Sequence, residues 1–198
     1  MSYDICLRDP ATMEVLELPV KHLMHGGTFQ AEIDENTGLL TPAAISDAWL
    51  NVTYNYARYY YEASEGDPRF FGSLKDDSDD EEDRNLGIRG IYGKTGAESI
   101  PMLNDLISRI TGKYCKDGEW SVTQRIKTRY LEQNGNEMSF KEYLFGKKTC
   151  VKREQYEVEV SEGDTDDYWM DTAANAIRPL HQLIAMAQLR PDGVWNGD

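Results

Sequence analysis

Residues 50 to 56, LNVTYNY, place two amides and a hydroxyl at alternate positions. In an extended strand, side chains alternate between the two faces, so Asn51, Thr53 and Asn55 share one face and Tyr56 lies on the other. Asn and Thr offer directional hydrogen-bond donors and acceptors at low charge, which suits the binding of a polar ligand. The alternative is that the amides satisfy buried backbone groups of neighbouring loops.

Residues 93 to 99, GKTGAES, form a second polar group. A phosphate-binding P-loop has the spacing GxxxxGK[ST], and the position five residues before Gly93 is Ile88, so the motif is absent. Backbone amides at a helix start, beside Lys94 and Thr95, still make a reasonable anion site. The alternative is that the glycines of this segment only make tight turns.

A third polar group lies on the helix predicted at residues 171 to 190, whose apolar residues recur at helical spacing. Pro179 interrupts this helix, removes the hydrogen bond to the carbonyl of Asn175 and predicts a kink. We therefore expect Asn175 and Arg178 to lie beside a freed polar group.

Catalytic and metal-binding patterns are weak. His22 and His25 are three residues apart but have no carboxylate or thiolate nearby to complete a metal site, so we expect no metal. Glu98 could act as an acid or base with a second carboxylate, yet such pairs are common in a chain with 35 Asp and Glu residues. We assign no catalytic residue and no cofactor.

A helix must follow the GKTGAES segment, because apolar residues between 103 and 110 repeat at helical spacing and Gly112 is a plausible stop. Thr95 with Glu98 matches a capping box, but that start would enclose Pro101 in the helix. We therefore predict Ser99 as the N-cap.

The charge distribution indicates an insertion. Residues 113 to 153 hold ten basic and five acidic residues, a balance of +5, which leaves −19 for the remainder of a chain whose net charge is −14. In WSVTQRIKTRYLEQ, residues 120 to 133, apolar and basic side chains alternate, and a second alternating run follows near residues 150 to 160. We predict a single domain, 1–198, that carries a basic β-hairpin insertion at 113–160.

Residues 76 to 83, DDSDDEED, are acidic at all but one position and predict a flexible acidic loop over 74–86. A second interpretation is an acidic decoy for nucleic-acid-binding proteins. The net charge argues against direct binding of nucleic acid, whose phosphates require Lys and Arg.

No apolar run approaches the roughly 20 residues of a membrane-spanning helix, and the three cysteines lack a CxxC pattern, so we expect a cytoplasmic protein with no membrane partner.

The segments SYDICL, HGGT, LNVTYNY, GIRGIYGKTGAESIPML and DDYWMDTAANAIRPLHQLIAMAQLRPDGVWNGD resemble a family of short, uncharacterised bacterial and bacteriophage proteins. The likeness covers a little over half of the chain. It implies a phage or prophage setting, and hence the host cytoplasm, but it brings no catalytic residue.

Together these patterns predict an α+β fold, in which an antiparallel sheet has two main helices packed on one face, plus the β-rich insertion. We expect non-catalytic binding of a small polar or nucleotide-like ligand, such as a host signal that a phage accessory protein would sequester. The predicted ligand-binding residues are Asn51, Thr53, Asn55, Tyr56, Lys94, Thr95, Glu98, Ser99, Asn175 and Arg178. Two alternatives are an acidic inhibitor that binds a host protein by mimicking nucleic acid, and a carboxylate-dependent hydrolase or transferase. The oligomeric state is not predicted.

Overall fold

The structure is a computed structural model that describes residues 2–23, 31–33, 35–38, 40–42, 44–73, 83–146 and 148–197. The chain divides into two compact units, Met1–Glu119 with Gly163–Asp198, and Trp120–Glu162. His25 and most of the predicted acidic loop, residues 74–82, lie outside the described residues.

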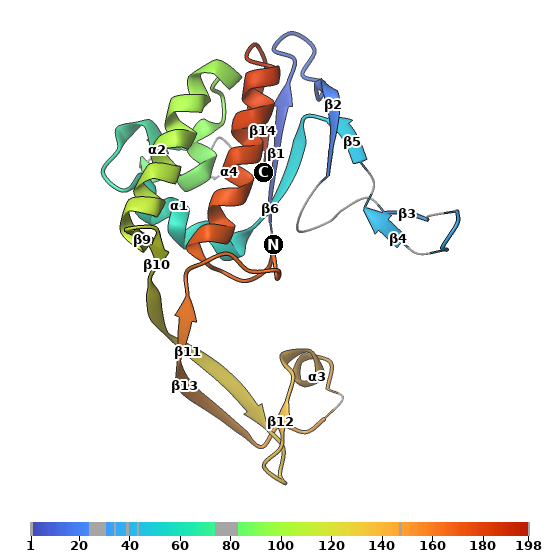
Figure 1. The fold of residues 1–198 in the computed structure, drawn as a ribbon, viewed down its shortest axis with the longest axis vertical. Coiled ribbons are helices and arrows are strands. Elements are labelled where there is room, and N and C mark those ends of the chain that lie inside the picture. Colours follow the sequence, from blue (N-terminus) through green and yellow to red (C-terminus); the bar gives the residue numbers. More distant parts are fainter. Residues whose placement is uncertain are drawn as a thin grey trace. The chain divides into compact units, whose positions relative to one another are not determined.

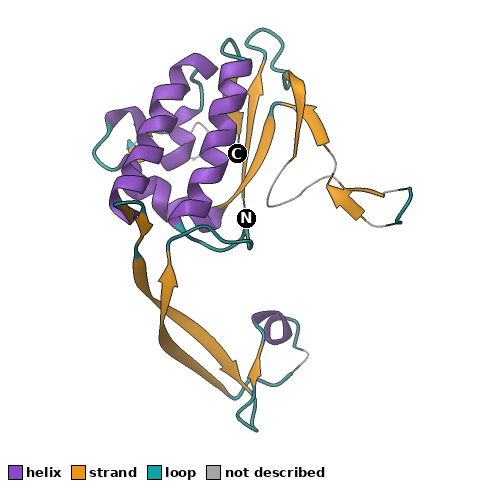
Figure 2. Ribbon diagram, in the orientation of Figure 1, coloured by secondary structure: helices purple, strands orange, loops and turns teal. Residues whose placement is uncertain are grey.

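Helices and antiparallel strands both contribute to the structure, so the predicted α+β class is confirmed (Figures 1 and 2). In chain order the strands are β1 (Ser2–Arg8), β2 (Glu17–Leu23), β3 (Ala31–Ile33), β4 (Leu40–Pro42), β5 (Ala44–Asp47), β6 (Trp49–Thr53), β7 (Phe71–Gly72), β8 (Arg84–Asn85), β9 (Cys115–Lys116), β10 (Glu119–Trp120), β11 (Val122–Leu131), β12 (Glu137–Met138), β13 (Lys152–Ser161) and β14 (Val194–Gly197). The α-helices are α1 (Ala57–Ser64), α2 (Gly96–Tyr114), α3 (Phe140–Leu144) and α4 (Ala173–Leu189), and the 3-10 helices are η1 (Tyr54–Tyr56), η2 (Pro68–Phe70) and η3 (Gly87–Ile91).

The core of the first unit is built on a three-stranded antiparallel sheet in the order β14-β1-β6. The first strand of the chain therefore lies between the last strand and β6. Helices α2 and α4 pack side by side and cover one face of this sheet (Figure 1). Alternate residues of β1, among them Ile5 and Leu7, are fully buried, as the period of a strand requires.

Helix α2 begins four residues earlier than predicted. Thr95 is its N-cap, and the capping box is complete because Glu98 N–H donates to the Thr95 hydroxyl at 3.2 Å while Thr95 N–H donates to the Glu98 carboxylate at 2.8 Å. Pro101 consequently lies inside the helix. A proline removes one helical hydrogen bond, and the two bonds of the capping box offset that loss. The prediction of Ser99 as the N-cap is wrong, and Gly112 does not end the helix.

Helix α4 runs from Ala173 to Leu189 with Pro179 inside it, and its N-cap is Thr172. The predicted apolar stripe of this helix is buried. The side chains of Asn175 and Arg178 bond the loop that precedes the helix, as described below, so they do not mark a polar gap at the proline.

The second unit is a long ribbon in which β11 pairs antiparallel with β13 over ten residues, from Val122 opposite Ser161 to Leu131 opposite Lys152. The return of the second alternating run alongside the first is therefore confirmed. The unit starts later than the predicted insertion, because residues 113 and 114 end α2, and β9 and β10 form a separate small pair. The ribbon face that carries Ile126 is open at that residue, which is 68% exposed.

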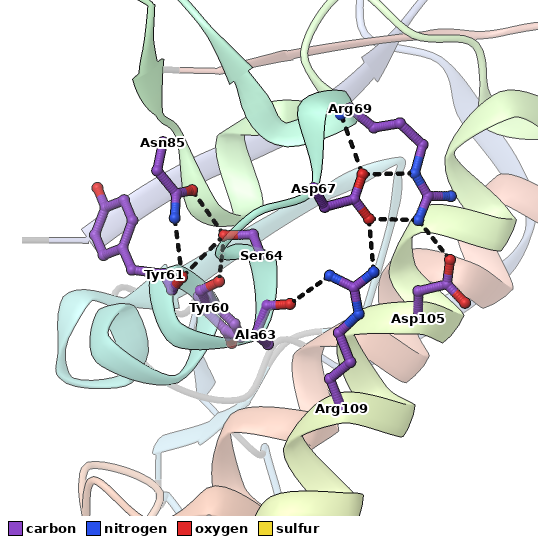
Figure 3. Close-up of polar contacts among 9 residues, drawn as sticks. All are labelled: Tyr60, Tyr61, Ala63, Ser64, Asp67, Arg69, Asn85, Asp105 and Arg109. Carbon is purple, nitrogen blue, oxygen red and sulfur yellow. Dashed lines mark hydrogen bonds and ion pairs between the residues drawn. The ribbon is translucent and has the colours of Figure 1, made fainter.

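A buried carboxylate links the end of α1 to α2 in the first unit (Figure 3). Asp67 is only 7% exposed and accepts hydrogen bonds from Arg69 Nη2 at 2.6 Å and from Arg109 Nη2 at 2.8 Å. Arg109 Nη1 also donates to the carbonyl of Ala63, and Arg69 Nη2 donates to Asp105. The hydrogen bonds from Arg69 hold the pKa of Asp67 well below its usual range.

We expect Asp67→Asn to lower the free energy of unfolding by about 2 kcal/mol, because two half-exposed guanidinium groups lose their shared carboxylate. Urea denaturation at neutral pH measures this loss. Asp105→Asn is the matched control: its carboxylate is exposed and forms an ion pair with Arg69 at the edge of the cluster, so its loss should stay within about 0.5 kcal/mol.

The same cluster predicts a pH dependence. The pKa of Asp67 is lower in the folded state than in the unfolded state, so its stabilising contribution is complete above the unfolded pKa and is lost as the pH falls through the folded pKa. The difference between the wild type and Asp67→Asn should therefore shrink below about pH 4. Equal losses for the two variants at neutral pH would contradict the assignment of Asp67 as the centre of the cluster.

Candidate functional site

A groove of about 610 Å³ lies on the sheet face that carries the polar side chains of β1. It is lined by Asp4, Cys6, Arg8, Val15, Asp47, Trp49, Asn196 and Gly197. The strand register explains this set: Cys6 is paired with Trp49 on β6 and with Asn196 on β14, and directly paired residues share a face of the sheet. The volume is in the range of small-molecule sites, roughly 300 to 1,000 Å³.

The groove is rich in hydrogen-bond acceptors. Asp4 and Asp47 bring two carboxylates, Asn196 brings an amide, and Trp49 offers a flat indole ring. Arg8 is the cation of the lining, and its Nη1 donates to the carbonyl of Met13 at 2.7 Å. Its buried Nε has no hydrogen-bond partner among the described residues.

Asn51 lies directly opposite Asp4 on the adjacent strand and is 2% exposed. Its Nδ2 donates to Ser2 Oγ at 2.8 Å and to Asp4 Oδ1 at 2.6 Å, which fixes the Asp4 carboxylate at the groove. Its Oδ1 is buried and accepts no hydrogen bond from any described residue. A buried acceptor left without a donor is unfavourable by about 1 to 3 kcal/mol, but Asn51 is not among the residues that line the groove, so its contribution to the site is to position Asp4.

Cys6 is buried within the groove lining, and its thiol donates to the carbonyl of Asn196 at 3.5 Å. Burial raises the pKa of this thiol above its ordinary value. Because the thiolate is the nucleophilic form of cysteine, a raised pKa disfavours covalent catalysis by Cys6.

Four predicted site residues meet at the loop of residues 163–172. Asn55 Nδ2 donates to the carbonyl of Trp169 at 2.7 Å, and the Tyr56 hydroxyl donates to the carbonyl of Tyr168. Asn175 Nδ2 donates to the carbonyls of Asp167 and Met170, each at 3.0 Å, and Arg178 forms an ion pair with Asp164. Three of these side chains bond the backbone of the loop, and Arg178 bonds the side chain of Asp164. Of the two amides of LNVTYNY, Asn55 therefore has the role considered as the alternative, whereas Asn51 bonds the side chains of Ser2 and Asp4.

The polar row expected along LNVTYNY is shorter than predicted. Strand β6 ends at Thr53, and the next three residues form η1, so Asn55 is not in register with Asn51. The Thr53 hydroxyl accepts a hydrogen bond from Asn55 N–H at 3.3 Å and caps η1. A short helix thus replaces the last part of the expected strand.

The GKTGAES segment pairs with the end of the chain. Gly96 N–H donates to the carbonyl of Gly193 at 2.8 Å, and Ala97 N–H donates to the carbonyl of Pro191 at 3.1 Å. Gly93 N–H and the Lys94 carbonyl both bond the backbone of Trp195. The amides that an anion site requires are therefore engaged, and the geometry favours tight packing as the role of this segment.

Thr95 and Glu98 are occupied by the capping box, and Ser99 is buried, where its hydroxyl accepts from Trp195 Nε1 at 2.7 Å. The hydrogen bond from the Thr95 backbone lowers the pKa of Glu98. A general acid needs the opposite shift, so the geometry offers Glu98 no support as a proton donor.

Nine of the ten predicted residues thus fall at three places: beside the groove, around the loop 163–172, and at the start of α2. The tenth, Thr53, caps η1. Asn51 donates to a residue that lines the groove. The sequence reasoning missed Asp4, Arg8, Trp49 and Asn196. The alternation of residues 2 to 8 could have placed Asp4 and Arg8 on one face, but the pairing of both ends of the chain with one another carries no local signal.

In the described part of the chain, no cluster of three or more His, Cys, Asp or Glu side chains is arranged to hold a metal ion. None of the helices described combines the length and the apolar character needed to cross a membrane. Comparison with known proteins finds no matching family model, no matching curated protein and no matching solved structure for this chain.

Proposed function

We propose that the protein binds a small polar ligand, without chemical change, in the groove beside Asp4 and Trp49. The observation that carries the proposal is the groove of about 610 Å³, which is lined by the Asp4 carboxylate, held by Asn51 Nδ2 at 2.6 Å, and by the indole of Trp49. Sites lined by polar groups gain specificity, because a ligand that lacks the matching donors leaves those groups unpaired.

The charges of the groove narrow the class of ligand. Two carboxylates face one guanidinium, so a phosphate would meet a net repulsive field, whereas N–H groups would find several acceptors. The indole of Trp49 provides a surface on which a planar ring can stack. The combination supports a neutral or cationic nucleoside-like molecule more than a nucleotide. In a phage setting, sequestering such a molecule would deprive the host of a signal.

Native mass spectrometry of protein purified from its natural host, before and after denaturation, should release a small molecule. Titration calorimetry with adenosine, guanosine and cytidine then tests the class, with the corresponding 5′-monophosphates as charged counterparts. We expect at least one nucleoside to bind and its monophosphate to bind more weakly.

Asp4→Asn should weaken nucleoside binding about tenfold, because a hydrogen bond to a charged acceptor contributes about 1.5 to 3 kcal/mol. Trp49→Ala should weaken it similarly through loss of stacking. Asp83→Asn makes the same chemical change at an exposed position away from the groove lining and should bind like the wild type. Retained affinity in both groove variants, with unchanged melting temperatures, would exclude the groove as the site.

A further inference from the structure

Strand β13 has an unpaired edge. In the sheet order β12-β11-β13, it pairs with β11 on one side, and no described strand pairs with it on the other. It is ten residues long, and alternate residues of such an edge direct their N–H and C=O groups away from the existing sheet. The sheet has three strands only where the two residues of β12 pair with β11, and elsewhere it is a two-stranded ribbon, an arrangement that is only marginally stable by itself. The edge is thus a ready template for a further antiparallel strand.

The charges of β13 are segregated along its length. Its first residues are Lys152 and Arg153, and Glu157 and Glu159 lie toward its end; all four side chains are exposed. Glu154, which lies between these two groups, forms ion pairs within the ribbon with Lys152 and with Arg129 of β11. Charged side chains are enough to protect an exposed edge strand from aggregation, and that protection does not require basic residues at one end of the strand and acidic residues at the other. When a strand with this polarity meets its own copy in antiparallel orientation, the basic half of each strand faces the acidic half of the other.

The neighbouring strand lacks this property. Strand β11 carries Arg125, Lys127 and Arg129 and no acidic residue. Antiparallel pairing of β11 with its own copy would therefore bring like charges together, which is unfavourable. In addition, β12 occupies part of its outer edge, at Tyr130 and Leu131. Self-complementarity is confined to the β13 edge of the ribbon.

We infer that a second copy of this chain docks on the β13 edge, and that the two ribbons join into a four-stranded antiparallel sheet in the order β11-β13-β13-β11. The interface has twofold symmetry, so each contact occurs twice. A register in which Tyr156 lies opposite its own copy places Arg153 opposite Glu159 and Gln155 opposite Glu157. This register combines an aromatic cross-strand pair with two repeated polar pairs, of the kind that stabilises sheets.

Two charge-reversal variants test the inference. The acidic variant carries Lys152→Glu and Arg153→Glu, and the basic variant carries Glu157→Lys and Glu159→Lys. Each replaces the attractive pairs of the interface by like charges, so each should raise the dimer dissociation constant at least about tenfold over the wild type. An equimolar mixture of the two variants restores opposite charges between residues 153 and 159 at both copies of that contact and should form a heterodimer.

Sedimentation velocity over a range of micromolar concentrations measures the association of the wild type, of each variant and of their mixture. Lys127→Glu is the control: it reverses an exposed charge on β11, which does not meet the partner strand, and should dimerise like the wild type. Arg153 also lies over the rings of Tyr130 and Tyr143, so circular dichroism must show that the acidic variant is folded. If the acidic variant is not folded, single Glu159→Lys, which leaves those rings untouched, should still raise the dimer dissociation constant at least about tenfold by itself.

Association of the mixture, with neither variant associating by itself, would establish the β13 edge as the interface. A wild type that is monomeric at every concentration would overturn the inference. Dimers of both variants with wild-type affinity would overturn it equally, as would folded variants that fail to associate when mixed.

Discussion

Trp195→Ala should lower the free energy of unfolding by about 4 kcal/mol, in the range found when large core aromatics are truncated. Trp195 is 0% exposed although it lies three residues from the end of the sequence. Its indole fills the core beneath α2 and donates to Ser99 Oγ at 2.7 Å. Its backbone bonds Gly93 and Lys94, so the residue joins the last strand to the start of that helix.

Chemical denaturation of three variants separates the contributions of the indole. Trp195→Phe retains most of the apolar contact but leaves the buried Ser99 hydroxyl without its donor, and we expect a loss of about 2 kcal/mol. Trp169→Ala is the control, because Trp169 is exposed at its loop and its truncation should change stability by less than about 1 kcal/mol. Similar losses for Trp195→Ala and Trp169→Ala would show that the end of the chain is not part of the cooperative core.

Gly96→Ala should destabilise the protein by about 3 kcal/mol, although alanine is the better helix former. A Cβ at Gly96 would lie 2.6 Å from the carbonyl oxygen of Arg190 and 3.1 Å from Pro191 Cα. Both are backbone atoms of the segment that receives the first N–H groups of α2, so neither can move without breaking those bonds. The glycine is required for close approach of two chain segments.

Gly112→Ala makes the same substitution in the same helix and should stabilise the protein by about 0.5 to 1 kcal/mol. Nothing lies within 4 Å of a Cβ at Gly112. Melting temperatures of the two variants should therefore shift in opposite directions. A shift of the same sign in both would mean that helix propensity, and not the contact with Arg190, decides the effect at Gly96.

The parts of the fold that depend on local patterns were predictable. The helical periods of α2 and α4 and the strand alternation of β11 arise within single segments, and the structure contains each of these elements. The start of α2 was predicted wrongly because the rule against an internal proline was weighed without Gly193 and Pro191, whose carbonyls accept from the first helical amides. A tertiary contact outweighed one local rule.

The groove was predictable only in part. Asn51 was selected for its position in LNVTYNY, and it does contact the groove residue Asp4. Asn55 was selected by the same alternation, which fails where η1 replaces the strand. The groove itself needs residues 4 to 8, 47 to 49 and 196 to 197 to lie on adjacent strands. Pairing between such distant segments depends on the whole topology and leaves no periodic pattern in a single sequence.

The position of β1 between β6 and β14 has a consequence during protein synthesis. A nascent chain that has emerged as far as α4 still lacks residues 194–197, so one side of its first strand stays unpaired while the ribosome continues. Cys6 and Asn196, which pair across these strands, are 190 residues apart in the sequence, and contacts between such distant segments form slowly. The groove includes Asn196 and Gly197, so the proposed ligand site is expected to be complete only after β14 has been synthesised and has paired with β1.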